Sequence, residues 1–176
     1  MIKLRAVWTW ILGSSLAVAA TCADGPNERL RGLGVELPAP SAAIANYVPA
    51  VRTGSLVFLA GHLPRGADGK VVQGKVGAGV DEAAGYEAAR LTAIALLGSL
   101  AAEIGDLDRV VRIVRVGGYV NAAPDFSRHP QVINGCSDLL VAVFGEKGKH
   151  ARVAAGMSSL PLDAVVEIEM VVEVRD

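Results

Sequence analysis

The 176-residue chain carries 17 basic and 18 acidic side chains, a formal charge of −1, and 52% of its residues are hydrophobic. A balanced charge without basic blocks argues against nucleic-acid binding, because affinity for phosphates comes from clustered Lys and Arg. The three histidines, His62, His129 and His150, are isolated, and none is spaced from a cysteine as metal ligands are. We therefore expect a globular protein with no bound metal and no nucleic-acid partner.

The first 23 residues predict a secretory signal peptide. Lys3 and Arg5 precede an apolar stretch over 6–18, and small residues near 19–23 suit cleavage. The apolar run is shorter than the ~20 residues that a membrane span needs. Cys22 could carry a lipid, but the residues before it lack the leucine of a lipoprotein signal, so lipid anchoring is not expected. The sequence predicts an exported protein, periplasmic or secreted, that leaves the membrane when the signal is removed.

The mature chain would be one domain without a disulfide. Without Lys3 and Arg5, 15 basic residues face 18 acidic ones, a formal charge of −3, and cleavage after Ala23 leaves Cys136 as the single cysteine. Residues 24–44 are expected to form an N-terminal strap over the core. It would contain a short helix over 27–34, with Asn27 as N-cap and Gly34 as the stop. Residues 45–176 then suit a single domain.

The first half of this domain predicts a hairpin and then a helix. Strands over 47–52 and 56–63 flank a Thr-Gly turn, and a short third strand is expected over 71–73. From Asp81, apolar residues recur every three or four positions as far as Gly105, which predicts a long helix capped by Asp81.

The second half predicts a strand over 109–121 and a helix ending at Phe144, with Cys136 buried in that helix. Arg109, Arg112 and Arg115 lie three apart in the strand, so we do not expect them to share one face. Two strands, over 151–157 and 165–174, follow around a Pro-Asp turn and would form a second hairpin. In the last strand, apolar and acidic residues alternate, which predicts one buried face and one wet face.

A single arginine, Arg152, enters the apolar strand 151–157, and Glu167 would lie roughly opposite it in the hairpin. An unpaired buried guanidinium is costly, so a structural ion pair between the two is one interpretation. The other is that Arg152 binds a substrate carboxylate through its two parallel donors, with Glu167 beside the ligand. Spacing does not decide between them. The order of elements predicts an α+β fold, a mixed sheet with two helices on one face.

Six short segments follow one another along the chain: Asn46-Tyr47-Val48-Pro49, Leu59-Ala60-Gly61-His62, Gly118-Tyr119-Val120-Asn121, Ala151-Arg152, Leu160-Pro161 and Val166-Glu167-Ile168-Glu169. This pattern resembles the signatures of the Rid (RidA/YjgF) family of imine deaminases, over about 45–174. The resemblance implies a chorismate-mutase-like (YjgF-type) fold, assembled as a homotrimer with pockets between subunits.

The resemblance also implies an activity: hydrolysis of small reactive 2-imino acids, or their enamine tautomers, to 2-keto acids and ammonia. It implies that Arg152 and Glu167 are catalytic, with Arg152 binding the substrate carboxylate. Tyr47, Ala60, Gly61 and His62 would complete the substrate site. It implies no metal and no organic cofactor.

The chain departs from the family pattern at four positions, where Ala60, His62, Pro124 and Ala154 replace the family's usual hydroxyl, glutamine, asparagine and cysteine. As a hypothesis, His62 faces the pocket and supplies acid–base capacity. The lost hydrogen-bonding partners motivate an alternative, a trimer that binds small carboxylates without catalysis. Endoribonuclease action, a label some relatives carry, is not expected from the acidic mature charge.

Overall fold

The computed structural model describes residues 25–40 and 46–176. The signal peptide predicted over 1–23, with Cys22, lies outside the described residues, as does the end of the strap at 41–45. Within the described ranges, no helix is both long and apolar enough to cross a membrane.

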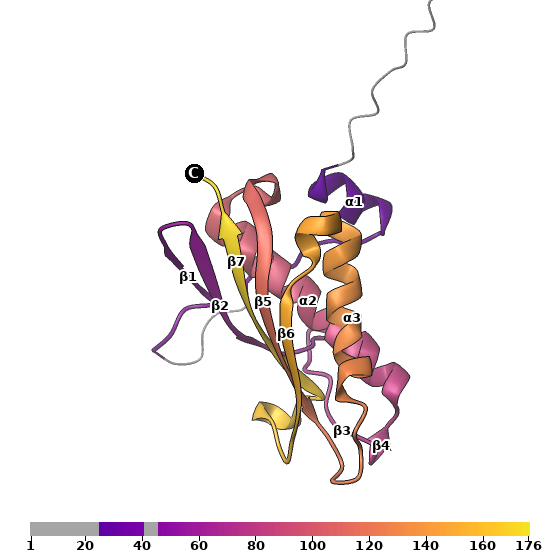
Figure 1. Cartoon of the computed structure of the whole chain (residues 1–176). Coiled ribbons are helices and arrows are strands. Elements are labelled where there is room, and N and C mark those ends of the chain that lie inside the picture. The colour runs from indigo at the N-terminus through magenta and orange to yellow at the C-terminus, as the bar shows by residue number, and fades with distance from the viewer. Residues whose placement is uncertain (1–24, 41–45) are drawn as a thin grey trace, which may run out of the picture.

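One five-stranded sheet forms the centre of the molecule. Its strand order is β1 (Ala50–Thr53), β2 (Leu56–His62), β7 (Val166–Val174), β5 (Val110–Asn121) and β6 (Ala151–Met157). Neighbours are antiparallel except β5 and β6, which are parallel. The sheet is therefore mixed, and β1 and β6 are its two edges (Figure 1).

The hairpin of β1 and β2 confirms the prediction, and Gly54 at its turn has φ +56°. The short strand predicted over 71–73 is wrong, because those residues make only isolated bridges. A small parallel pair forms slightly later, between β3 (Lys75–Val76) and β4 (Gly79–Val80).

Two helices, α2 (Glu82–Ile104) and α3 (His129–Phe144), cover one face of the sheet and pack on each other (Figure 1). As predicted, the Asp81 carboxylate caps α2 by accepting from the Ala84 N–H at 2.8 Å. Cys136 is fully buried in α3, also as predicted. The predicted α+β class with a two-helix layer is confirmed.

The alternation predicted for the last strand is confirmed in β7. The side chains that face the helices are at most 1% exposed: Val166, Ile168, Met170, Val172 and Val174. The glutamates on the other face are half-buried. We call this second side of the sheet, opposite the helices, the outer face.

The strap begins with the short helix α1 (Pro26–Gly32). Gly25 is its N-cap, so the expected cap at Asn27 is wrong; the Asn27 amide instead donates to Asp106 at 3.1 Å. Gly34 follows the helix with φ +66°, a conformation that glycine adopts without strain.

The second predicted hairpin is wrong. β6 pairs with β5 and not with β7, which lies between β2 and β5. The reason is topological, because α3 carries the chain from β5 to β6 as a crossover, the connection that parallel strands require. A turn containing Leu162 and Asp163, both at positive φ, then leads into β7. Thus β6 is an edge strand, and most of its residues are exposed.

Candidate functional site

Glu167 lies on the outer face, directly against Gly61 of β2. A Cβ atom added to Gly61 would overlap the Glu167 carboxylate, so the absence of a side chain makes room for it. Two of the predicted site residues are therefore brought together. They lie at a bulge in β2, where three steps along β2 match two along β7.

The environment of Glu167 raises the pKa of its carboxyl group. Burial is the main cause, and the negative charge of Glu169 adds to it. A carboxyl group with a raised pKa exchanges its proton closer to neutral pH than an ordinary glutamate does. Glu167 is therefore suited to proton transfer.

Glu169 anchors a polar cluster beside Glu167. Its Oε1 accepts from Arg115 Nη1 at 2.7 Å and from the Tyr119 hydroxyl at 3.4 Å. Arg115 and Tyr119 both belong to β5. Sequence reasoning assigned neither residue to the site.

The positions of Arg112 and Arg115 correct part of the expectation about the three arginines, because these two share the outer face, whereas Arg109 precedes β5. β5 shifts register against β7 twice, between Val110 and Arg112 and between Ile113 and Arg115. Each shift changes which residues face outward, so Arg112 pairs with Glu173 and Arg115 with Val171, both on the outer face. A prediction that side chains alternate strictly along a strand does not include such bulges. The sequence of β5 contains no other feature that marks where they occur.

A shallow hollow of about 430 Å³ lies next to this cluster. Ala60, Arg115 and Glu169 contribute to it, so a third predicted residue joins the outer-face site. The remaining walls are mainly apolar: Val48, Val51, Phe58, Leu59, Met170 and Val171. Tyr47, which precedes β1, is 53% exposed and adjoins Val48 in the chain.

His62 lies on the other side of the sheet from Glu167. It pairs with Ile168, whose side chain is buried beneath the helices. Its Nε2 hydrogen-bonds with Ser99 Oγ of α2 at 2.7 Å, and its Nδ1 with the Ala60 carbonyl at 2.8 Å. Burial lowers the pKa of His62, opposed by the bond to Ala60. Within one chain, His62 and Glu167 therefore do not face the same side of the sheet.

Arg152 is also on the helix side, at the exposed edge of the sheet. It pairs in register with Val116, an inner-face residue, and its Nη1 donates to Asn134 Oδ1 and Ser137 Oγ of α3, each at 2.9 Å. The predicted pairing of Arg152 with Glu167 does not occur within one chain. Its guanidinium group is exposed to solvent and retains further N–H donors.

A second histidine supports the Arg152 site. His150 Nε2 lies 3.1 Å from Ser137 Oγ, and its Nδ1 lies 2.7 Å from the Gly148 carbonyl. The Gly148 carbonyl can only accept a hydrogen bond, so His150 Nδ1 carries the proton. In the neutral ring Nε2 is then an acceptor, and the Ser137 hydroxyl donates to it. Ser137 then accepts the hydrogen bond from Arg152, which fixes the guanidinium on α3.

The described part of the chain contains no group of three or more His, Cys, Asp or Glu side chains that could hold a metal ion. The outer face offers a carboxyl group of raised pKa, a neighbouring ion pair and an apolar hollow.

Known proteins match both this fold and most of this chain. Residues 27–174 match a family model described as "YjgF/chorismate_mutase-like, putative endoribonuclease". Protein TCP17 of Trypanosoma cruzi is 40% identical over 148 residues, which is 84% of this chain and 92% of the relative. The chain belongs to the YjgF/chorismate-mutase-like family.

Two solved structures support the assignment of the fold. The protein Atu1372 of Agrobacterium tumefaciens, of unknown function, is 42% identical, with a TM-score of 0.78 and coverage of 85% of this chain and 91% of that one. A protein of Shewanella oneidensis, described as a "putative endoribonuclease", is 34% identical, with a TM-score of 0.83 and coverage of 86% and 100%.

Proposed function

We propose that this protein is an imine deaminase that hydrolyses small 2-imino acids, or their enamine tautomers, to 2-keto acids and ammonia. The observation that carries the proposal is Glu167, which is half-buried against Gly61 with a raised pKa, on a face that also carries the Arg115–Glu169 ion pair and a mainly apolar hollow. The imine carbon is already electrophilic, so the reaction needs little beyond orientation and proton transfer.

In the proposed reaction, Arg152 binds the substrate carboxylate and Glu167 acts as the general base and acid. Glu167 takes a proton from the attacking water as oxygen bonds to the imine carbon. Glu167 returns that proton to the nitrogen, which gives the neutral carbinolamine. The nitrogen then gains a proton from solvent, Glu167 takes the hydroxyl proton, and the C–N bond breaks to release ammonia as the carbonyl forms. The solvent-exposed guanidinium of Arg152, fixed by Asn134 and Ser137, suits bidentate carboxylate binding. Neither a metal nor an organic cofactor has a part in these steps.

We further propose that the working site needs two subunits of a homotrimer. Arg152 and Glu167 lie on opposite faces of one sheet, two strands apart, so one chain cannot present both to one small substrate. The exposed edge of β6 in one subunit would meet the outer face of another and bring the two residues together. The sequence of residues 1–23 leads us to place this activity outside the cytoplasm.

A trimer that binds small carboxylates without catalysis is the second candidate. Two observations favour it. Ala60 lines the hollow without a hydroxyl group, and Ala154 follows Arg152 on β6 without a thiol. Each missing hydrogen bond would be worth roughly 0.5–1.5 kcal/mol in substrate orientation.

The test is release of ammonia and keto acid from freshly generated 2-iminopropanoate. We expect acceleration by the mature protein and its loss in both Arg152→Ala and Glu167→Gln. Arg31→Gln, which changes an exposed arginine of α1, is the matched control and should keep full activity. No acceleration by the intact protein, together with pyruvate binding that requires Arg152, would support the second candidate. Salt-dependent cleavage of RNA would instead support the activity named for some relatives.

A further inference from the structure

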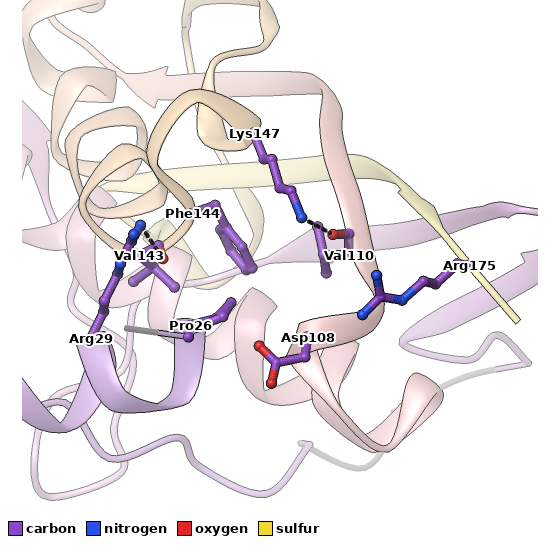
Figure 2. A pocket seen from close by; sticks show the side chains of 9 residues that line it. Pro26, Arg29, Asp108, Val110, Val143, Phe144, Lys147 and Arg175 are labelled. Atoms are coloured by element: carbon purple, nitrogen blue, oxygen red, sulfur yellow. Dashed lines mark hydrogen bonds between the residues drawn. The ribbon is translucent and has the colours of Figure 1, made fainter. Parts of the chain in front are cut away.

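A separate cavity of about 310 Å³ lies where both ends of the described chain meet the end of α3. Figure 2 shows it from close by. Its walls come from α1 and its N-cap, the turn before β5 and the first residue of β5, the end of α3 and the turn after it, and the C-terminal segment. The lining residues are Gly25, Pro26, Arg29, Asp108, Val110, Val143, Phe144, Lys147 and Arg175. None of these residues belongs to the proposed deaminase site.

The lining is strongly cationic. Arg29, Lys147 and Arg175 approach the cavity from three segments distant in sequence, and Asp108 is the single carboxylate among the lining residues. The formal charge of the lining is therefore +2. Like charges gathered around one hollow repel each other, and a bound anion would relieve that repulsion.

Two of the cationic side chains, Arg29 and Lys147, are held by hydrogen bonds and keep further N–H donors. Arg29 Nη1 donates to the Val143 carbonyl at 3.3 Å, and Lys147 Nζ donates to the Val110 carbonyl at 3.4 Å (Figure 2). Each of these bonds uses one N–H group and leaves others for a ligand. The Arg175 guanidinium makes no hydrogen bond or ion pair with another residue in the described ranges, and it points toward the cavity.

The floor of the cavity is apolar. Val110, Val143 and Phe144 are at most 5% exposed, and Pro26 lies beside them. A low-dielectric wall strengthens the attraction between a bound anion and nearby cations. This cavity is suited to a small oxyanion, because it combines fixed hydrogen-bond donors, a net positive charge and a wall of buried apolar side chains.

We propose that this cavity binds a small dianion, a phosphate or a short dicarboxylate, between Arg29, Lys147 and Arg175. The charge of the lining matches two negative charges, and the volume is at the lower end of the range for small-ligand pockets. A bound dianion would tie α1 to the C-terminal segment. This proposal does not depend on the deaminase reaction.

Isothermal titration of the mature protein with inorganic phosphate and with succinate, at constant ionic strength, tests the proposal. We expect at least one of the two to bind, and the Lys147→Gln/Arg175→Gln double variant to bind it at least tenfold more weakly. Asp108→Asn removes the opposing carboxylate and should tighten binding severalfold. Arg31→Gln, an exposed change on the same helix α1, should bind as the unaltered protein does.

Circular dichroism of each variant without anion checks that the fold is intact. Binding of phosphate alone would identify a tetrahedral oxyanion site, and binding of succinate alone a dicarboxylate site. Absence of binding by both anions would overturn the proposal. Equal affinity in the double variant and the Arg31→Gln control would also overturn it.

Discussion

Glu167 shows how one residue acquires chemical properties from its neighbours. Gly61 leaves space for the carboxylate, burial raises its pKa, and the charge of Glu169 raises it further. Glu169 in turn is held by Arg115 at 2.7 Å. The acid–base behaviour of the site therefore depends on β2, β5 and β7 together.

Removing the charge of Glu169 should lower the pKa of Glu167. In the proposed mechanism, the acidic limb of the pH–rate profile reports the pKa of the general base, so Glu169→Gln should move that limb to lower pH. Carbon-13 NMR of the Glu167 carboxyl group gives the same pKa without turnover. If Glu169→Gln changed neither the acidic limb of the pH–rate profile nor the Glu167 pKa measured by NMR, the role given to Glu169 would be contradicted.

The raised pKa of Glu167 also affects stability. A carboxyl group whose pKa is higher in the folded state adds no penalty below its unfolded pKa of about 4.3, and it destabilises the fold as pH rises through the folded pKa. Glu167→Gln should therefore raise the melting temperature at pH 7, and the difference should vanish near pH 4. The effect is modest because the side chain keeps contact with water. Melting curves at both pH values check this.

Cys136 should be unreactive while the protein is folded. Burial raises the pKa of its thiol from 9.0 to about 12. At pH 8 the reactive thiolate is then about a thousandfold scarcer than for a thiol of ordinary pKa, and the reagent also lacks access. Ellman's reagent should label a Cys22→Ser protein only after denaturant is added. Rapid labelling without denaturant would show that Cys136 is accessible.

At the scale of secondary structure, bulges decide which side chains share the site. The bulge in β2, between Leu59 and His62, reverses the faces of the residues that follow it, so that Gly61 meets Glu167 and His62 meets Ser99. The register shifts in β5 turn Arg112 and Arg115 to the outer face. Without them, strict alternation would place these two arginines on opposite faces.

Two glycines should respond differently to alanine. In Gly61→Ala the new Cβ meets only the flexible end of Glu167, which can move away, so stability should change little while deaminase activity falls. In Gly135→Ala the new Cβ meets the backbone of Tyr86 and Arg90, where α3 touches α2. That backbone cannot move cheaply, so a loss of about 1–3 kcal/mol is expected.

Urea unfolding of the two variants, with assays of imine hydrolysis, measures both effects. A large destabilisation by Gly61→Ala would mean that Glu167 cannot move aside. Unchanged stability in Gly135→Ala would mean that the two helices can separate at this point without loss.

At the scale of the whole molecule, the outer face exposes apolar side chains. Val51, Phe58 and Val171 form one row across three strands, and Val51 and Phe58 are 53% and 45% exposed. At the edge, Val153 and Met157 of β6 are each 41% exposed. Exposed apolar rows of this kind are typical of surfaces that bind other subunits.

Phe58→Glu should dissociate the proposed trimer, because a carboxylate in an apolar subunit interface loses its hydration without gaining a partner. Leu33→Glu is the matched control, since Leu33 is also 45% exposed but lies at the end of α1. Sedimentation equilibrium should give trimers for the unaltered protein and the control, and smaller species for Phe58→Glu. A monomeric unaltered protein would exclude the trimer, and with it the shared site.

The sequence alone determined the elements whose signals are local. The period of α2, its cap at Asp81, the alternation of β7 and the turn at Gly54 follow from side-chain pattern and backbone preference, and the structure confirms them. The ordered motifs also identified the family fold. They brought Gly61 and Glu167 to attention before their contact was known.

Only the tertiary structure decided which strands pair and which way the site residues face. β6 lies at the sheet edge because the α3 crossover requires parallel pairing with β5, and this places Arg152 on α3 and away from Glu167. His62 and Arg115 changed faces because bulges shift register by one residue, which reverses every following side chain. Strand pairing and bulges depend on contacts between residues far apart in the chain, and local patterns do not contain that information.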